Sequence, residues 1–314
     1  MNNLIFSLNA TIPVFLMMVL GYLFRRLGLF SESLASGMNT FVFRITLPVL
    51  LFHDLATVDF AEAWDTKFVL FCFIVTLFSI AFAGGISFLW KDRSIQGEFI
   101  QAAYRSSAAI LGIAFISNIY GGAGMAPLMI IGSVPLYNIM AVVVLSVFQP
   151  ERKPLDGALL RRTAKGIVTN PIILGILAGL IWSAAGLPMP PILSKTASSL
   201  GGVSTPMGLM AMGASFDPKK ALGKRRPAVT AAAIKLVGFC TLFLPLAVLL
   251  GFREEKLVAI LVMLGSATTV SSYVMARSMG HEGTLSASTV MLTTLFSAFT
   301  LTFWLWLLRS LGYI

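Results

Sequence analysis

The sequence has few charged residues for its length. Only 11% of its 314 residues are Asp, Glu, Lys or Arg, and 57% are hydrophobic, whereas a soluble domain carries about 25% charged residues. Its apolar runs are long enough to cross roughly 30 Å of hydrocarbon as helices, at about 1.5 Å per residue. The alternation expected of barrel strands is missing. The sequence therefore predicts an all-α polytopic membrane protein.

Cysteine and histidine are also scarce, with two residues of each. Cys72 and Cys240 lie in apolar runs without metal-ligand spacing, which is typical of buried small hydrophobic residues. No Asp or Glu lies deep in an expected span. Neither a metal cluster nor a nucleophile–base pair is therefore expected, and we predict no cofactor, no metal and no enzyme activity. The N-terminus has no basic region, so a cleaved signal peptide is not expected.

Basic residues exceed acidic ones and give a net charge of +10. They lie in short loops rather than on a domain, so we do not expect nucleic-acid binding. Ten membrane helices are expected, at about 4–24, 34–54, 68–90, 97–119, 124–148, 164–186, 191–213, 228–251, 255–279 and 285–310. Most Lys and Arg fall on one side when the N-terminus is placed outside, which predicts that both termini are extracytoplasmic.

The two halves of the chain repeat with an offset of 158 residues. This register aligns Pro and Gly residues, which rarely match by chance: Pro13 with Pro171, Gly21 with Gly179, Gly28 with Gly186 and Pro48 with Pro206. Because five helices per half is an odd number, the second copy enters from the opposite side of the membrane. We therefore expect inverted five-helix repeats at 1–148 and 164–314, joined by a cytoplasmic linker at 149–163.

Two expected helices have centres rich in small and hydroxyl residues. These are 97–119, with Ser106, Ser107 and Gly112, and 255–279, with Gly265, Thr268, Thr269, Ser271 and Ser272. They occupy corresponding places in the two halves. In inverted-repeat transporters, broken helices at such places form the substrate site near the midplane. The pattern predicts a crossed pair of broken helices, with tight packing of small residues as the alternative.

Three cations fall within expected spans. Arg105 directly precedes the serines of the first break, which favours a role in binding. Arg44 precedes Pro48 and could bind substrate or tie its helix to a freed carbonyl, and Lys235 could reach the surface instead. Cations without acidic partners predict an anionic substrate. His53 is a titrating group near the expected cavity mouth, although a lone His is more often a helix-end residue.

Seven segments, in order, resemble bacterial members of the auxin efflux carrier family. They are LPVLLFHDLA, RSSAAILGIAFISNIYG, SVPLYNIMAVV, NPIILGILAGLI, STPMGLMAMGASF, ATTVSSYVMARSMG and STVMLTTLFSAFT. The resemblance implies a ten-helix fold similar to bile-acid symporters and sodium/proton antiporters, located in the bacterial inner membrane. Helices 1, 2, 6 and 7 would form a scaffold, and helices 3–5 and 8–10 would form a transport domain that moves like an elevator.

Organic anions are the substrates that the resemblance implies, such as auxin or malate. Family members commonly carry Asn at the position of Ser107, so this substrate contact differs here, and Asn138 is expected beside the crossing. We therefore expect a secondary transporter of a small organic anion, with an anion channel or a substrate-sensing receptor as alternatives. Residues are expected to bind substrate (Arg105, Ser106, Ser107, Gly112, Asn138, Thr268, Thr269, Ser271, Ser272), to shape the scaffold (Pro48, Pro206, Arg44) or to couple transport (His53, Lys235). The expected partners are the bilayer and, through scaffold helices, a second copy.

Overall fold

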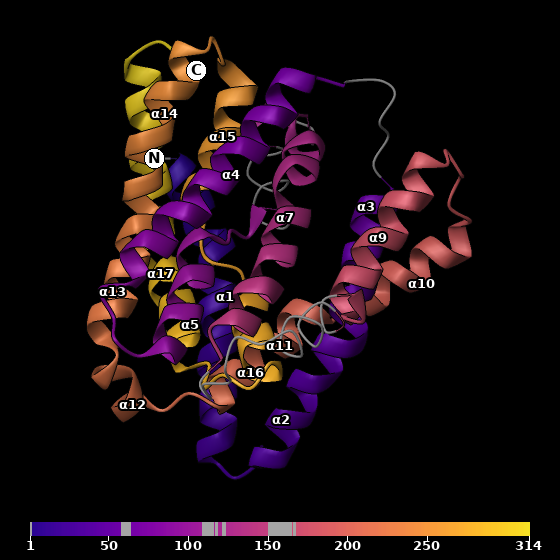
Figure 1. The fold of residues 1–314 in the computed structure, drawn as a ribbon, viewed down its shortest axis with the longest axis vertical. Helices are drawn as coiled ribbons and strands as arrows, with labels where there is room; N and C mark the ends of the chain where they lie inside the picture. The colour runs from indigo at the N-terminus through magenta and orange to yellow at the C-terminus, as the bar shows by residue number, and fades with distance from the viewer. Residues whose placement is uncertain are drawn as a thin grey trace.

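The computed structural model describes residues 2–57, 64–108, 116, 119–120, 124–149, 165 and 168–314, and these residues form helices and connecting turns without a strand (Figure 1). The first half contains α1 (Asn2–Arg26), α2 (Glu32–Phe41), the π-helical turn η1 (Val42–Thr46), α3 (Leu47–Ala56), α4 (Thr66–Ser87), α5 (Arg93–Tyr104) and α7 (Ala126–Val147). The second half contains α9 (Pro171–Ala184), α10 (Pro191–Gly202), α11 (Ser204–Ala214), α12 (Pro218–Gly223), α13 (Arg225–Ala233), the π-helical turn η3 (Ile234–Gly238), α14 (Phe239–Leu249), α15 (Glu254–Gly265), α16 (Ser271–Ser278) and α17 (Thr284–Ser310).

Five helical stretches in the described part of the chain are long and apolar enough to cross a membrane. They are Glu32–Ala56, Thr66–Ser87, Ala126–Val147, Arg225–Leu249 and Thr284–Ser310, and each overlaps an expected span. The apolar helix α9 is shorter, because Asn170 caps it by accepting a hydrogen bond from the Ile172 amide. Two expected spans, 97–119 and 255–279, are interrupted, and the span expected at 191–213 is divided at Val203. The chain is a multi-pass membrane protein.

Proline accounts for the widened turn in the middle of the Glu32–Ala56 stretch. Pro48 has no amide hydrogen to donate to the carbonyl four residues earlier, and η1 lies directly before it, with the Leu47 amide bonded to the Val42 carbonyl. A widened turn rotates the residues that follow it relative to those before it. As a result, α3 presents Leu47, Leu50 and Leu51 to the interior cleft described below.

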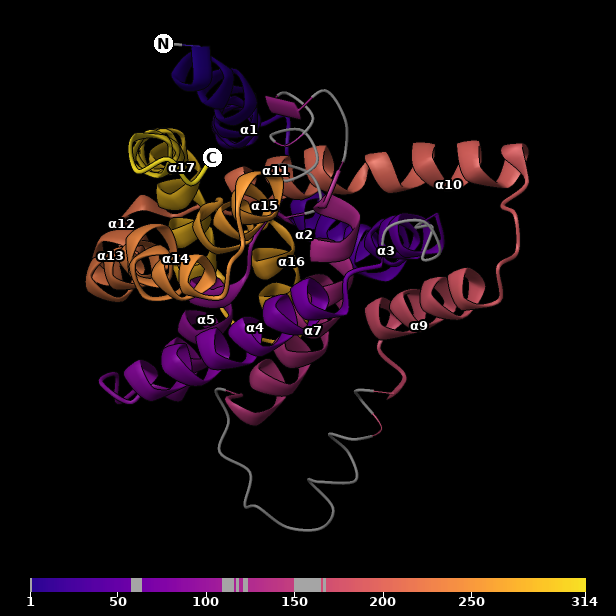
Figure 2. The same ribbon diagram turned by 90° about the horizontal axis from the view of Figure 1, so that it is seen from above.

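Glycines let helices from the two halves of the chain pack backbone to backbone. A Cβ atom on Gly21 of α1 would lie 2.2 Å from the Met210 carbonyl oxygen of α11. A Cβ atom on Gly179 of α9 would lie 2.8 Å from the Phe52 carbonyl oxygen of α3. Small residues at helix contacts allow this close approach in membranes. Figures 1 and 2 both show α3, α9 and α10 as a group at one side of the molecule, away from α13, α14 and α17.

One acidic residue among those that the structure describes is fully buried, near the start of an expected span. Glu98 of α5 is 0% exposed, and its carboxylate accepts hydrogen bonds from the amides of Gly283 and Ser286, each at 2.9 Å. It therefore caps the first turn of α17 from another helix. Sequence reasoning missed this residue because its partners lie in the other half of the chain.

We expect Glu98→Ala to destabilise the protein by about 2 kcal/mol, because two buried amides lose their acceptor. Thermal unfolding in detergent measures this as a lower melting temperature. Glu32→Ala is the matched control, since Glu32 makes only an exposed ion pair with Arg25 at 3.6 Å. Equal melting temperatures for the two variants would show that the carboxylate of Glu98 does not stabilise α17.

Candidate functional site

A narrow cleft with a cavity volume of about 60 Å³, partly open to solvent, lies in the interior between two walls. One wall comes from η1, α3 and α11, and the other from the end of α5, the middle of α7 and the start of α16. We call it the substrate cleft. Its lining residues are Val42, Leu47, Leu50, Leu51, Asp54, Ser204 and Thr205 on the first wall, and Arg105, Ser106, Ser107, Val134, Tyr137, Asn138, Thr269, Val270, Ser271 and Val274 on the second.

The second wall is built where two helices break. Helix α5 ends at Tyr104 and the chain continues extended at Arg105, with ψ 144°. Helix α15 ends at Gly265, the chain continues extended at Ser266, with ψ 162°, and α16 begins at Ser271 after a helical turn residue, Val270. Each break leaves backbone groups without helical partners, and such groups need other partners in a membrane.

The two breaks satisfy one another. The Ser107 amide donates to the Ala267 carbonyl at 2.9 Å, and the Thr268 hydroxyl donates to the Ala102 carbonyl at 2.8 Å. The hydroxyls of Ser106 and Ser266 also bond to each other. The extended segments therefore form one hydrogen-bonded unit, and the small and hydroxyl residues seen in the sequence supply its partners.

Arg105 is the cation of the substrate cleft and is only 1% exposed. One terminal nitrogen, Nη2, donates to Asn138 Oδ1 at 2.8 Å and to Ser271 Oγ at 2.5 Å, and the other donates to Met275 Sδ at 2.8 Å. Gln101 Oε1 lies 3.5 Å from that second nitrogen. No carboxylate in the described part of the chain forms an ion pair with Arg105, and its Nε has no acceptor there.

An unpaired buried cation is costly unless an anion joins it. The guanidinium is held by neutral groups that leave its charge uncompensated, and Ser271 stands at the N-terminal end of α16, where amide dipoles add positive potential. Asn138 is oriented by its own bond to the Val134 carbonyl at 2.9 Å. The arrangement suits a carboxylate that meets the guanidinium and neighbouring hydroxyls together.

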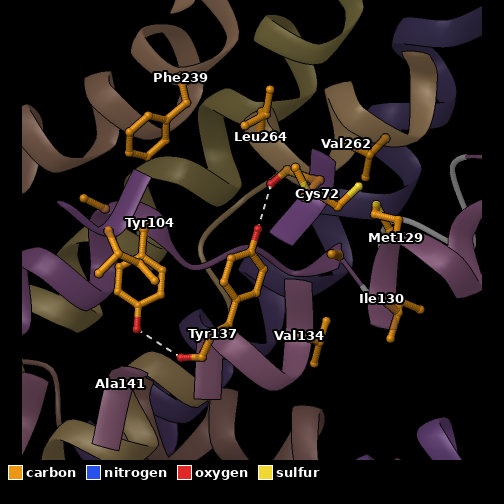
Figure 3. Packing of buried hydrophobic residues seen from close by; sticks show 14 of the residues in the cluster. Cys72, Tyr104, Met129, Ile130, Val134, Tyr137, Ala141, Phe239, Val262 and Leu264 are labelled. Carbon is orange, nitrogen blue, oxygen red and sulfur yellow. Dashed lines mark hydrogen bonds between the residues drawn. The ribbon is translucent and has the colours of Figure 1, made fainter. Parts of the chain in front are cut away.

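Tyrosines fix α7 against both broken helices. The Tyr104 hydroxyl donates to the Tyr137 carbonyl at 3.0 Å, and the Tyr137 hydroxyl donates to the Met263 carbonyl of α15 at 3.4 Å (Figure 3). Apolar neighbours such as Val134 and Leu264 surround this pair in the same view. The α7 side of the substrate cleft is thereby tied to the end of α5 and to the end of α15.

The structure brings six of the predicted binding residues together at the substrate cleft: Arg105, Ser106, Ser107, Asn138, Thr269 and Ser271. Thr268 and Ser272 are buried and do not line it. The Thr268 amide donates to Thr293 Oγ1 at 3.0 Å, and the Ser272 carbonyl accepts a hydrogen bond from Gln101 Nε2. Gly112 lies outside the described residues.

The predicted scaffold and coupling residues lie elsewhere. Pro48 is buried behind the cleft wall, whereas Pro206 and Arg44 are exposed, and none of the three lines the cleft. His53 Nε2 lies 3.1 Å from Ser194 Oγ, which joins α3 to α10. Lys235 does not reach the surface, since it is 0% exposed.

Sequence reasoning missed Asp54, Tyr137, Ser204 and Thr205 as cleft residues. The helical spacing of Leu47, Leu50, Leu51 and Asp54 places them on one face, so a heptad-type count could have found Asp54. Asp54 brings a carboxylate to the wall that faces Arg105. The substrate cleft therefore carries one cation on one wall and one acid on the other.

A second, wider cleft with a volume of about 970 Å³ opens at the ends of α1 and α16. We call it the basic cleft, since its lining includes five basic and three acidic side chains: Arg25, Arg26, Lys219, Lys220 and Arg277, with Glu32, Asp217 and Glu282. Burial opposes ionisation of Glu282, but hydrogen bonds from Lys224 and Lys220 outweigh it and lower the pKa of its carboxyl to about 2. Positive charge thus exceeds negative charge on this surface.

The chain resembles known membrane transport proteins over almost its whole length. A family model described as membrane transport protein matches residues 6–305. The chain is 26% identical to a protein of Rhizobium meliloti named "Putative malonate transporter", over 96% of each chain. It is 21% identical to an "Uncharacterized transporter" of Methanothermobacter thermautotrophicus, over 95% of this chain and 97% of the relative. An uncharacterized transporter of Methanocaldococcus jannaschii is 22% identical over 96% of this chain and 99% of its own. The chain thus belongs to the membrane transport protein family, the auxin efflux carrier family that its motifs resemble.

Proposed function

We propose that the protein is a secondary transporter that carries a small carboxylate by an elevator-type motion. The observation that carries this proposal is Arg105, buried in the substrate cleft among neutral partners and without an acid to pair with it. A carboxylate completes this set of donors, and a cation would be repelled by it. The named malonate relative fits the same chemistry.

The different character of the two walls supports movement of one past the other. The wall with Arg105 supplies most of the polar groups, and the η1–α3 part of the opposite wall is largely apolar, with Leu47, Leu50 and Leu51. A substrate bound through charge would travel with the polar wall, while the apolar side chains would slide across it. The proposed motion would have to break the polar contact between α2 and α16, in which Asn39 Nδ2 donates to Ser278 Oγ at 3.1 Å.

The glycine contacts support the proposed ten-helix inverted repeat. The offset of 158 residues relates Gly21 to Gly179 and Phe52 to Met210. Gly21 meets Met210 in the α1–α11 contact, and Gly179 meets Phe52 in the α3–α9 contact, so the two contacts are related by the same offset. We propose repeats at 1–148 and 164–314, with the scaffold formed by α1, α2–α3, α9 and α10–α11. The transport domain would comprise the remaining helices.

In this arrangement both termini face out of a bacterial inner membrane, and the basic cleft faces the cytoplasm, where it attracts anions. A homodimer through scaffold helices stays a prediction.

Uptake into liposomes that contain the purified protein tests the function. We expect saturable uptake of a small carboxylate and acceleration by the same anion on the far side, because a carrier exchanges substrate through one site. Malonate, malate, acetate and an indole carboxylate form the panel. Flux without saturation or counterflow would favour the alternative, an anion channel, and tight binding without flux would favour a substrate-sensing receptor.

Asp54→Asn refines the substrate class in the same assay. Loss of this carboxylate removes repulsion of a second negative charge in the cleft, so we expect the preference for dicarboxylates over monocarboxylates to rise by about tenfold, or 1.4 kcal/mol. Asp217→Asn is the control, since Asp217 caps α12 outside the substrate cleft. An unchanged preference would show that Asp54 does not face the bound anion.

A further inference from the structure

Lys235 is a fully buried lysine outside the substrate cleft. It lies in the π-helical turn η3, and its ammonium donates to the carbonyls of Met263 at 3.1 Å and Leu264 at 2.8 Å. No carboxylate in the described ranges forms an ion pair with it. A buried cation held only by carbonyl oxygens has the surroundings of a coordinated metal ion more than those of a salt bridge.

The two carbonyls belong to the last turn of α15, at its break. Because the chain turns extended at Ser266, the carbonyls of Met263 and Leu264 lose the amides that would follow them in a continuous helix. Their negative dipole end points at Lys235. The corresponding end of α5 has a neutral partner, since the Ala102 carbonyl accepts from the Thr268 hydroxyl. The two breaks are therefore completed in different ways.

This arrangement connects to the substrate cleft through one atom. The Met263 carbonyl accepts from Lys235 and also from the hydroxyl of Tyr137, which lines the substrate cleft. Close packing seals the site, since a Cβ on Gly265 would lie 2.8 Å from Cys240 Sγ. The position of the broken segment beside Arg105 thus depends on a cation at the end of α15.

We propose that the Lys235 ammonium is a tethered substitute for an alkali cation. Secondary transporters use the carbonyls of half-helix C-terminal ends to coordinate Na⁺, and here a covalently attached cation fills that place. The break is assembled without a bound ion, so substrate binding does not require Na⁺. This inference rests on the proposed function for its consequence in transport, but the cation site itself can be tested without any substrate.

Lys235→Ala vacates the carbonyl cage and tests the proposal. We expect the purified variant to melt at a temperature at least about 3 °C higher in NaCl or methylammonium chloride than in choline chloride at equal ionic strength, because a small cation binds the folded state alone. The wild-type protein is expected to show no such difference. In liposomes, carboxylate uptake by the variant falls at least about tenfold in choline and recovers in part with methylammonium or Na⁺.

Lys67→Ala is the matched control, because the Lys67 ammonium also donates to a helix-end carbonyl, that of Leu250 at 2.6 Å, but at an exposed position. It should show no cation-specific effect.

Loss of flux in Lys235→Ala that no cation restores, with the same melting temperature in all three salts, would overturn the proposal and leave Lys235 as a packing residue. Sodium-dependent melting or flux of the wild-type protein would also overturn it, and this measurement decides the matter if the variant does not fold. Absence of carboxylate flux in the wild-type protein would contradict the proposed function only, since the melting comparison needs no substrate.

Discussion

Arg105→Ala is expected to lower the affinity for the transported carboxylate by more than about 100-fold, or 2.7 kcal/mol. The guanidinium supplies charge-assisted hydrogen bonds in a buried cleft, and the remaining hydroxyls of Ser107, Thr269 and Ser271 supply neutral ones. Ligand titration monitored by calorimetry, followed by uptake into liposomes, measures the loss. Arg105→Lys keeps the charge but not the planar fork, so we expect an intermediate loss of about tenfold.

The stability of Arg105→Ala distinguishes a binding role from a structural one. Removal of an uncompensated buried cation relieves its desolvation cost, whereas Asn138 Oδ1 loses a donor, so the two effects oppose each other and the empty variant should melt within a few degrees of the wild type. Arg309→Ala, an exposed cation at the end of α17, is the control for general charge effects. A variant that melts much lower and still binds carboxylate with wild-type affinity would remove Arg105 from the binding site.

Gly21→Ala is expected to cost about 3 kcal/mol of stability or more, the upper range for overpacking a tight contact. Its Cβ would lie 2.2 Å from the Met210 carbonyl oxygen, and a backbone atom cannot rotate away as a side chain can. Helices α1 and α11 would have to separate along their contact. In Gly179→Ala the new Cβ would lie 2.8 Å from the Phe52 carbonyl oxygen, so we expect a smaller loss of stability than in Gly21→Ala.

Gly37→Ala provides the matched control for these two variants. Gly37 lies in α2, and a Cβ there would meet nothing within 4 Å, so the change should stabilise the helix by up to about 1 kcal/mol. The expected order of melting temperatures is Gly37→Ala, wild type, Gly179→Ala and Gly21→Ala, from highest to lowest. Equal values for Gly21→Ala and Gly37→Ala would contradict the close α1–α11 contact.

Much of the substrate cleft follows from local sequence patterns. Runs of Ser, Thr and Gly marked both breaks, because backbone freed from a helix in a membrane needs small polar neighbours. Arg105 was identifiable since a cation inside an apolar span needs a reason to be there. The glycines of the repeat register, Gly21 and Gly179, both lie at close helix contacts in the structure, although the register by itself did not name the residues that they meet.

Residues whose partners are distant in the chain could not be found in this way. Glu98 appears as an ordinary acid near a helix start, and its burial depends on Gly283 and Ser286. Lys235 resembles a lysine that extends to the surface until the carbonyls of α15 are located. Pro206 does not line the cleft itself, although its neighbours Ser204 and Thr205 do, and its role in shaping the scaffold stays a prediction. Such pairings are products of tertiary packing rather than of local pattern.

The two walls of the substrate cleft divide recognition between two parts of the chain. In the proposed function, Arg105, Asn138 and Ser271 would hold the acid group of the cargo, while the leucines of α3 would meet the rest of it. Substitutions among Leu47, Leu50 and Leu51 would change the size of acceptable cargo without touching the charge-binding groups. New substrates are therefore accessible to evolution in single steps, because volume and charge are encoded by separate residues.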